Sequence, residues 1–575
     1  MNRPITECFQ IGCERLTAWA DVIDRINVFP IADGDTGRNL VLSLAPLHSM
    51  GQRDVEDVAN DLLICARGHS GNIAGSFFSS FSTVTGTHQL PETALLARER
   101  AWRSLDDPKP GTMLSVFDVL CEALQELPTA QDNGWTAEVV RRLEQAVSAT
   151  SDQLPELEKA GVVDAGALGM FVFLDGFFTS LGGSKRGFAR ITELFGRKLS
   201  LRSGYQPVTT SGQCVDVVLK VEEGSRDHVS RNMRELGSSL TTIDGGKYLK
   251  AHMHTRDQAH LRKSLERLGS VKRWASDDLQ EQTNSFLQRA RDQVLHIVTD
   301  SAGSVTREAA AEMGISLLDS YVSIGSIAVP ESCIAPEELY RAMRDGVRVT
   351  TSQASVFERH QLYEKILSLY PRALYLCVGS VFTGNHEVAC AWKKSHDPDN
   401  RLTVMDTGLA SGKLGLAAIA SARHSMTAVN AEEVRDFAES AVASCREYIF
   451  LEKLHYLAAG GRMSKTGSVV GDFLHMRPVV TPTSEGVKKV AVFRSREAQL
   501  RFLLEEVEKA DSEGPLSDFL LQYTDNGPFL EETVLPELRK RVPAAAFLIQ
   551  PVSNTSGAHM GPGTWGVAFL PKIES

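Results

Sequence analysis

The stretch that decides the fold of the first third of the chain reads NVFPIADGDTGRN and covers residues 27–39. Asp33 and Asp35 lie two residues apart, so their carboxylates can point the same way in an extended loop. Mg²⁺ prefers hard oxygen ligands and binds a few carboxylates together with phosphate oxygens. Gly34 and Gly37 leave room where a phosphate must approach the backbone. Because the same residues also suit an ordinary surface turn, the loop needs support from elsewhere in the chain.

That support comes from three further glycine-rich loops within residues 1–198. They are Arg67-Gly68-His69-Ser70-Gly71, Pro110-Gly111-Thr112 and Asp164-Ala165-Gly166. The segments 55–66, 136–149 and 167–181 carry apolar side chains at helical spacing, and strand-like alternation is nearly absent. Four such loops in one helical region predict a ligand at the helix ends.

The four loops, in this order, resemble the signature loops of the DhaL-like family, the nucleotide-binding domain of dihydroxyacetone kinases. The version found in bacterial fatty acid kinases is the most similar, and the resemblance covers about residues 5–195. It implies an all-helical barrel, here residues 1–198, that binds ATP and two Mg²⁺ at one end.

The same resemblance implies roles for individual residues. Asp33 and Asp35 would be catalytic ligands of Mg²⁺. Nucleotide and phosphate contacts are implied at Thr36, Gly37, Asn39, Ser70, Gly71, Thr112 and Asp164. The family's third metal-binding aspartate has no clear match, and we assign Asn27 in its place. His69 stands where the family usually has asparagine, so that nucleotide contact is left open.

The whole chain has 575 residues, which predicts several domains rather than one core. Its net charge of −11 argues against a nucleic-acid-binding surface. The first residues lack the apolar core of a signal peptide, and the apolar run 167–181 is interrupted by Asp175 and short for a bilayer. Nine cysteines without a CxxC pair suit reduced thiols, so we expect a cytoplasmic protein without stable membrane insertion.

Residues 210–275 have the pattern of a small α/β domain. A strand is predicted over residues 215–221, a helix over 228–240, and two strands over 241–255. His252 and His254 lie two residues apart on the second of these, so both imidazoles face the same way.

Cys214 opens the preceding strand, and one cysteine with two histidines is a set that suits Zn²⁺. The spacing alone fits an exposed polar strand face better. The region, however, resembles the linker domain of the ATP-binding component of fatty acid kinases, in which the matching cysteine and histidines bind zinc. This resemblance implies a structural Zn²⁺ site at Cys214, His252 and His254.

From residue 294 onward, strands alternate with helices, which predicts an α/β domain with a mostly parallel sheet. Its motifs include Val298-Thr299-Asp300-Ser301, Thr350-Thr351-Ser352-Gln353, Ser380-Val381-Phe382-Thr383-Gly384, Gly460-Gly461-Arg462-Met463-Ser464-Lys465 and His559-Met560-Gly561-Pro562-Gly563. This ordered set resembles the DegV-like family of fatty-acid-binding proteins and implies a two-lobed domain over residues 294–575. Ala354, Thr383 and Asn385 depart from the family pattern, which usually has Pro, Ser and Thr there.

Hydroxyl donors suit a fatty acid carboxylate at the mouth of an apolar tunnel. The resemblance implies substrate contacts at Thr351, Ser352, Thr383, Gly384 and His559. His559 and Arg462 would also stabilise developing phosphate charge. Without the family pattern, a packed loop histidine and a buried arginine ion pair are the simpler interpretations, and for Arg462 both stay open.

Together these resemblances imply ATP-dependent phosphorylation of a bound fatty acid to an acyl phosphate. One alternative is a dihydroxyacetone-type (glycerone) kinase, which needs a substrate domain with a ketone-binding histidine. Another is a non-catalytic lipid carrier or sensor. The expected partner is a fatty acid and not a nucleic acid. Transient membrane contact, a homodimer and a downstream acyltransferase are compatible with the sequence.

Overall fold

The computed structural model describes residues 3–126, 134–183, 187–207, 212–222, 226–245, 248–279, 293–453, 456 and 476–573. The chain divides into two units, Met1–Leu287 and Gln288–Ser575. The first unit contains a helical region followed by a small α/β region, which we call the middle domain (residues 212–279).

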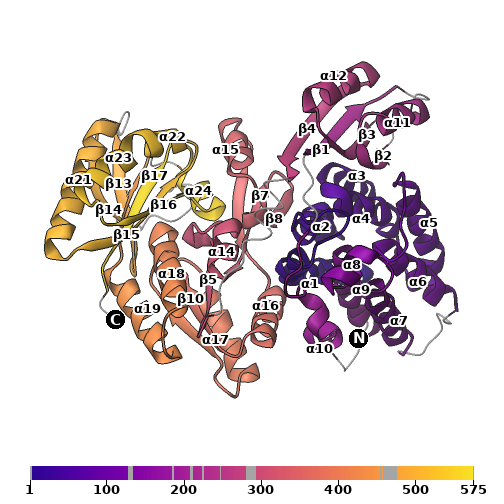
Figure 1. Cartoon of the computed structure of the whole chain (residues 1–575), viewed down its shortest axis with the longest axis horizontal. Coiled ribbons are helices and arrows are strands. Elements are labelled where there is room, and N and C mark those ends of the chain that lie inside the picture. The colour runs from indigo at the N-terminus through magenta and orange to yellow at the C-terminus, as the bar shows by residue number, and fades with distance from the viewer. Residues whose placement is uncertain are drawn as a thin grey trace. The chain divides into compact units, whose positions relative to one another are not determined.

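The helical region follows the pattern that the sequence predicts (Figure 1). Its elements are α1 Ile5–Arg25, α2 Thr36–Leu44, η1 Ala45–Ser49, α3 Val55–Cys65, α4 Gly68–Phe81, η2 Thr87–Gln89, α5 Leu90–Arg103, α6 Met113–Glu126, α7 Trp135–Thr150, α8 Pro155–Ala160, α9 Ala165–Gly182, α10 Ile191–Phe195 and η3 Gly196–Leu199. Each of the four glycine-rich loops leads directly into a helix, namely α2, α4, α6 and α9. The backbone N–H groups in the first turn of each of these helices have no partner within the helix and need partners from elsewhere.

The long helices contact one another in a cyclic order. Each helix of the series α1, α2, α4, α5, α6, α7 and α9 contacts the next one. Helix α9 contacts α1, which closes the ring. Phenylalanines from α1, α4 and α9 fill the interior, with Phe9 in edge-to-face contact with Phe78 and Phe177. Such aromatic pairs bury large apolar areas and define a single packed core.

Helix α9 is the one helix of the described residues that is long and apolar enough to cross a membrane by composition. In the structure it is buried inside the helical region. Asp175, in its middle, forms an ion pair of 2.6 Å with the buried Arg15 of α1. A buried carboxylate requires such a partner, so the charge that interrupts the apolar run is explained by packing within the protein.

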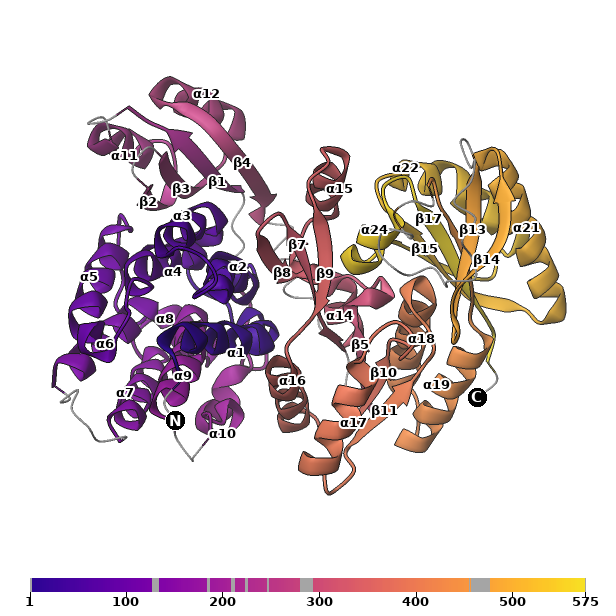
Figure 2. The ribbon, with the colours of Figure 1, turned by 180° about the vertical axis from the view of Figure 1, so that it is seen from behind.

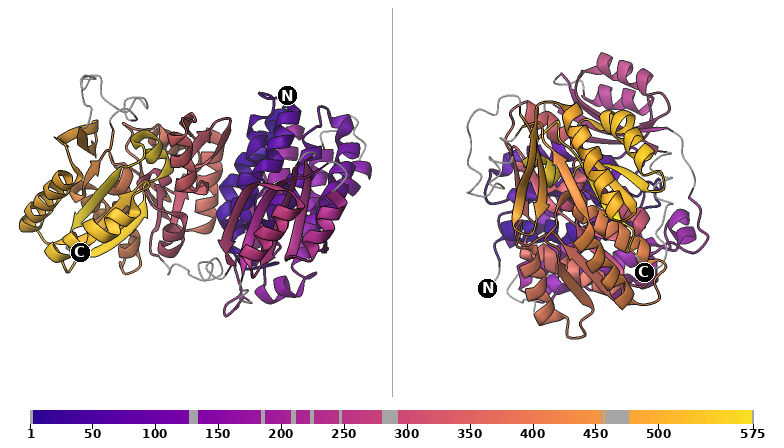
Figure 3. Two further views of the ribbon diagram at one scale, coloured as in Figure 1. Left: turned by 90° about the horizontal axis from the view of Figure 1, so that it is seen from above. Right: turned by 90° about the vertical axis from the view of Figure 1, so that its left-hand side faces the viewer.

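The middle domain is a four-stranded antiparallel sheet in the order β2-β3-β1-β4, covered by two helices. Its elements are β1 Gln213–Lys220, α11 Arg226–Arg234, β2 Ser238–Gly245, β3 Tyr248–Thr255, α12 Gln258–Leu268 and β4 Ser270–Asp278. In the left view of Figure 3 the magenta strands of this sheet run side by side. The helix predicted over residues 228–240 was wrong at its end, because α11 ends at Arg234, and strand β4 was not predicted.

The second unit begins with a four-stranded parallel sheet in the order β11-β10-β5-β6, as the sequence predicts. A three-stranded antiparallel sheet, β8-β7-β9, is inserted in the chain between β6 and β10 of the parallel sheet. The elements are β5 His296–Asp300, η4 Ser301–Gly303, α14 Arg307–Met313, β6 Ile315–Leu318, β7 Ser320–Ile324, β8 Ile327–Pro330, η5 Glu331–Cys333, α15 Pro336–Arg344, β9 Val349–Gln353, α16 Val356–Leu369, β10 Ala373–Cys377, α17 Asn385–His396 and β11 Leu402–Asp406.

The rest of the second unit is built on a six-stranded sheet in the order β14-β13-β12-β17-β15-β16 (Figure 2). Only β15 and β16 pair in parallel, so the prediction of a mostly parallel sheet was wrong for this part. The elements are α18 Ser411–Ser425, α19 Ala431–Ser444, β12 Arg446–Phe450, β13 Arg477–Thr483, β14 Gly486–Phe493, α21 Arg496–Glu513, β15 Leu516–Tyr523, α22 Gly527–Phe529, η7 Leu530–Val534, α23 Leu535–Arg541, β16 Ala546–Pro551, α24 Asn554–Met560 and β17 Trp565–Pro571.

Helix α18 joins the two large sheets of this unit, because it contacts β5 of one and β15 and β17 of the other. Small residues make this contact close: a Cβ at Gly415 would lie 1.9 Å from the carbonyl oxygen of Gly303. A larger side chain at position 415 would therefore force α18 away from η4, the turn that follows β5.

Candidate functional site

The loop between α1 and α2 holds Asp33 and Asp35 in a network of polar contacts. The Asn27 amide donates to Asp33, and its Oδ1 accepts a 2.6 Å hydrogen bond from the Thr36 hydroxyl. Gly34 has φ +68°, the left-handed conformation in which glycine is favoured. Asn27 therefore positions an aspartate here, and its predicted role as a metal ligand stays a prediction.

The carboxylates of Asp33 and Asp35 are both less easily ionised than an ordinary aspartate. Burial raises the pKa of Asp33, and the neighbouring Asp35 carboxylate raises it further. Burial also raises the pKa of Asp35, although Arg38 partly offsets this. Two half-buried carboxylates at close range are stabilised by a cation, so the donor set fits a divalent metal such as Mg²⁺.

One residue of this loop region was missed by the sequence analysis. Asp24, near the end of α1, accepts hydrogen bonds from the backbone N–H groups of Gly37 at 2.6 Å and Arg38 at 3.2 Å. Its carboxylate thereby holds the start of α2. Since Asp24 lies three residues before the stretch 27–39 and has no glycine beside it, only the folded geometry identifies it.

Gly37 and Gly71, for which the sequence predicts nucleotide contacts, lie where two helices pack closely together. A Cβ at Gly37 would lie 2.1 Å from the carbonyl oxygen of Ala20, and one at Gly71 would lie 2.1 Å from the Ser43 hydroxyl. Gly37 therefore permits α2 to lie against α1, and Gly71 permits α4 to lie against α2. Asn39 is buried beside Gly68 in the same contact. Phosphate contacts by these residues stay predictions.

A pocket of about 230 Å³ brings the other loops together. Its lining includes Ser70 of the second loop, Thr112 of the third and Asp164 of the fourth. Ser70 also connects to the loop between α1 and α2, because its hydroxyl lies 3.3 Å from that of Thr36. Asp164 caps α9 by accepting from the N–H of Ala167 at 2.7 Å, and burial raises its pKa to about 7.

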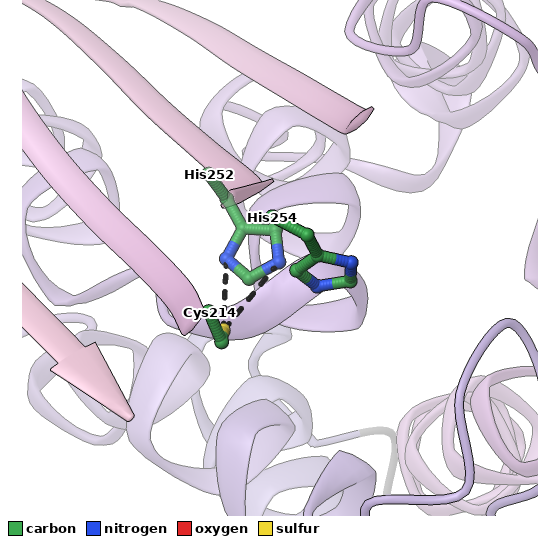
Figure 4. Close-up of side chains that lie close together, drawn as sticks. All are labelled: Cys214, His252 and His254. Carbon is green, nitrogen blue, oxygen red and sulfur yellow. Dashed lines mark hydrogen bonds between the residues drawn. The ribbon is translucent and has the colours of Figure 1, made fainter. Parts of the chain in front are cut away.

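The cysteine and two histidines of the middle domain converge in the structure (Figure 4). Cys214 of β1 pairs with His254 of β3 in the sheet register, and all three candidate ligand atoms lie within 4.8 Å of one another. The three side chains are buried, so the alternative of an exposed strand face is wrong. The adjacent rings support the prediction that His252 and His254 share one face.

The chemistry of this cluster suits a metal. Burial lowers the pKa of His254 to about 3, so its imidazole is neutral and can ligate at physiological pH. Burial and nearby carboxylates raise the pKa of Cys214, so its thiol keeps its proton unless a cation displaces it. The donor set is therefore one that Zn²⁺ accepts.

The cluster lies against the second glycine-rich loop of the helical region. Asp216 of β1 accepts from the Gly68 N–H at 3.1 Å and from the Asn72 side chain at 3.2 Å. The buried Lys250 donates to the carbonyl oxygen of Ala66. Burial alone would raise the pKa of Asp216, but the facing His252 and Lys250 hold it below its usual range. The middle domain thus supports the loop that carries Ser70.

In the second unit, Thr351 and His559 meet although 208 residues separate them: the hydroxyl of Thr351 lies 3.0 Å from Nε2 of His559. Thr351 comes from β9 and His559 from α24. Ser352, next on β9, is exposed. Arg462 lies outside the described residues.

The start of α17 holds the other predicted substrate residues. Thr383 accepts from the N–H of Asn385 at 3.1 Å, and Gly384 is the residue before the helix. The Asn385 amide donates at 2.8 Å to Asp300, which lies at the end of β5. Asn385, a departure from the family pattern, therefore connects the Thr383 loop to the parallel sheet.

Helix α24, which carries His559, is held by a buried carboxylate. Glu331 accepts from the N–H of Thr555 at 2.8 Å and from the Ser301 hydroxyl at 3.0 Å. Burial raises the pKa of Glu331 to about 7, and the nearby Asp319 contributes to the rise. The folded protein therefore keeps a proton on Glu331 at pH values where the unfolded chain has lost it.

Glu331→Gln is expected to change how thermal stability depends on pH. Because the folded pKa of about 7 lies above the unfolded value of 4.5, the wild type loses stability as pH rises through this window. Glutamine cannot ionise, so the variant should match the wild type at pH 5 and melt at a higher temperature at pH 8. Melting curves at both pH values measure this, with the exposed Glu485→Gln as control. Equal pH slopes for wild type and Glu331→Gln would contradict the assignment.

Three family models match the chain in the order that the sequence analysis predicts. A DAK2 domain covers residues 30–179, a FakA-like middle domain of the fatty acid kinase type covers residues 210–286, and a DegV family domain covers residues 294–572. The chain thus combines a DhaL-like domain, a fatty-acid-kinase-like middle domain and a DegV-like domain. The helical and α/β parts of the structure agree with this order.

Individual proteins resemble parts of the chain. DegV domain-containing protein TTE1491 from Caldanaerobacter subterraneus is 25% identical over 277 residues, which are 48% of this chain and 98% of that protein. Protein YloV from Bacillus subtilis is 27% identical over 365 residues, which are 57% of this chain but only 64% of YloV. A solved structure of a fatty-acid-binding DegV family protein from Thermus thermophilus aligns with a TM-score of 0.45 at 20% identity, over 48% of this chain and 99% of its own.

Proposed function

We propose that this chain, with its DAK2, middle and DegV domains, transfers the γ-phosphate of ATP to the carboxylate of a bound fatty acid. The observation that carries the proposal is the match of the middle domain to that of fatty acid kinases, placed between the other two domains. A DAK2 domain alone suits several acceptors. The middle domain and the DegV domain together favour a fatty acid.

The proposed reaction requires no covalent intermediate with the protein and no general base. A carboxylate oxygen of the fatty acid attacks the γ-phosphorus, the bond from that phosphorus to the β–γ bridging oxygen breaks, and ADP leaves. A carboxylic acid with an ordinary pKa of about 4 to 5 is already ionised at neutral pH, so no general base is required. Catalysis then consists of positioning and charge neutralisation.

Residues of the first unit bind the metal and the nucleotide, and residues of the second unit bind the fatty acid. Asp33 and Asp35 hold the Mg²⁺ that neutralises phosphate charge, while Asn27 and Asp24 position the loop. Ser70, Thr112 and Asp164 contact the nucleotide from the pocket walls. Thr351 and His559 bind the fatty acid carboxylate, with Ser352, Thr383 and Gly384 nearby in the family pattern.

Several broader features belong to the same proposal. We propose domain limits of 1–198, 210–275 and 294–575, and the cyclic helix contacts support a closed barrel in the first. A cytoplasmic location, a homodimer, transient membrane contact and a downstream acyltransferase stay predictions. Arg462 also stays a predicted catalytic residue.

The test is an acceptor assay with the full chain, labelled ATP and Mg²⁺. Oleate should yield a hydroxylamine-sensitive acyl phosphate, and dihydroxyacetone should yield no phosphorylated product. Phosphorylation of dihydroxyacetone would instead support a glycerone-type kinase. Bound fatty acid with no phosphate transfer to either acceptor would support the lipid carrier or sensor and overturn the proposal.

We expect the cluster of the middle domain to bind one zinc ion per chain. Replacing Cys214 by serine removes the thiolate, the strongest ligand of the three, and should lower the zinc content well below half an ion per chain. Elemental analysis of the purified protein by mass spectrometry measures this. The exposed Cys390→Ser is the matched control and should keep its zinc. Equal zinc in both variants would contradict the assignment.

A further inference from the structure

The nucleotide pocket has walls from two parts of the first unit. One side comes from the helical region and includes Phe29, Ser70, Thr112 and Asp164. The other side comes from residues 237–240, at the start of β2 in the middle domain. These four residues are separate from Cys214, His252 and His254, and the kinase mechanism proposed above assigns them no role.

The backbone at this wall is irregular. In the register of β2 with β3, Ser238 faces His254 and Thr241 faces His252. Three steps along β2 thus match two along β3, which defines a β-bulge with one extra residue. Ser239 has φ +57°, a left-handed conformation that is unfavourable for a residue other than glycine. Such bulges aim residues out of a sheet and are common beside functional sites.

The helical region holds the bulge through its backbone. The N–H of Asp106 donates to the carbonyl oxygen of Leu240 at 3.3 Å, and the N–H of Thr242 donates to that of Ser104 at 2.8 Å. Leu105 pairs with Thr241 as an antiparallel bridge. Residues 104–106 therefore extend the sheet at its β2 edge, and Leu105 and Asp106 also line the pocket.

His69 belongs to the second glycine-rich loop, residues 67–71, which we call the phosphate loop. Its side chain connects this loop to the bulge. Its Nδ1 lies 3.0 Å from the Thr241 hydroxyl, and its ring also hydrogen-bonds to the backbone of Ser239. A neutral imidazole has one donor and one acceptor nitrogen, so it can serve both partners at once. His69 itself lines the pocket beside Ser70.

We propose that the bulge of residues 237–241 is part of the nucleotide-binding site, and that His69 is a positioning residue that fixes it to the phosphate loop. The ligand is a nucleoside di- or triphosphate with Mg²⁺, bound between the helical region and the middle domain. The inference rests on the proposed nucleotide site, but it does not depend on the acceptor being a fatty acid.

The experiment measures Mg·ADP binding to the full chain by calorimetry, without fatty acid. Thr241→Val keeps the size of the side chain and removes the hydroxyl that meets His69, and we expect affinity to fall about 10-fold. Thr242→Val makes the same change on the opposite face of the strand, and should stay within about twofold of wild type. His69→Ala is a second variant, for which a loss at least as large is expected.

Hydrogen exchange gives a readout that a merely structural role would not move. Mg·ADP should slow exchange in the wild type both at residues 68–72 and at residues 237–242. Protection of the first segment alone, or wild-type affinity in Thr241→Val and His69→Ala, would overturn the inference. Absence of Mg·ADP binding by the wild type would overturn it too.

The outcomes separate this inference from the proposed function. If Mg·ADP binding depends on Thr241 but no acyl phosphate forms from oleate, the inference stands and the fatty acid kinase proposal fails. If acyl phosphate forms with an unchanged KM for ATP in Thr241→Val, the kinase proposal stands and the inference fails.

Discussion

Asparagine in place of Asp35 is expected to lower the rate of acyl phosphate formation by about 1,000-fold or more. The substitution keeps the size of the side chain but removes a negative charge that would hold Mg²⁺ against the phosphates. In phosphoryl transfer, most of the barrier reduction comes from such charge neutralisation. Initial rates with labelled ATP and oleate, at saturating Mg²⁺, measure the effect.

The same variant is expected to be more stable than the wild type when no metal is present. Burial raises the pKa of both Asp33 and Asp35, and the charge of Asp35 opposes that of Asp33. The ionised pair therefore costs stability as pH rises above the ordinary aspartate pKa, and one neutral partner removes part of that cost.

Melting temperatures with and without Mg²⁺ distinguish these effects. Mg²⁺ should stabilise the wild type and have little effect on Asp35→Asn. The exposed Asp57→Asn on α3 is the control and should behave as wild type in both assays. Full activity in Asp35→Asn, or an equal response to Mg²⁺, would show that the metal is not held at this loop.

Glutamine in place of His559 is expected to lower acyl phosphate formation by about 100-fold. His559 Nε2 lies 3.0 Å from the Thr351 hydroxyl, so the two side chains form one polar site from β9 and α24. As the carboxylate attacks, negative charge spreads over the transferring phosphate, and an imidazole donor there stabilises it.

Fatty acid binding should change less than turnover in this variant, because Thr351 and the other hydroxyl groups proposed to bind the carboxylate are kept. Retention of labelled oleate measures binding, and the ATP-dependent rate measures turnover. The exposed His396→Gln on α17 is the matched control. An equal loss of binding and turnover would make His559 a binding residue only, and no loss in either would exclude it from the site.

The order of the domains and several of the helices were predictable from the sequence, because their signals are local. The predicted helical segments 55–66, 136–149 and 167–181 correspond to α3, α7 and α9, because an apolar helical period marks a helix wherever it lies. The pairing of His252 and His254 on one face was predictable for the same reason, since a strand alternates with period two.

Local sequence patterns did not predict the secondary structure where a segment pairs with residues far away in the chain. Residues 235–240 were predicted to continue a helix, but from Ser238 the chain pairs with β3 and with residues 104–106. Strand β4 was missed because Lys272 and Arg273 interrupt its apolar pattern at the sheet edge. In both cases backbone hydrogen bonds to remote partners outweigh the weak preference of the segment.

The loop of residues 27–39 determined by itself that two carboxylates and two glycines stand together, because these residues are near neighbours in the chain. Only the tertiary structure decided what surrounds them. It placed the Asp24 carboxylate at the start of α2, brought Gly37 and Gly71 into contacts between helices, and buried Cys214 and its histidines against the second glycine-rich loop. These features depend on contacts between segments far apart in the chain, and their energies come from burial and packing that a single stretch of sequence does not contain.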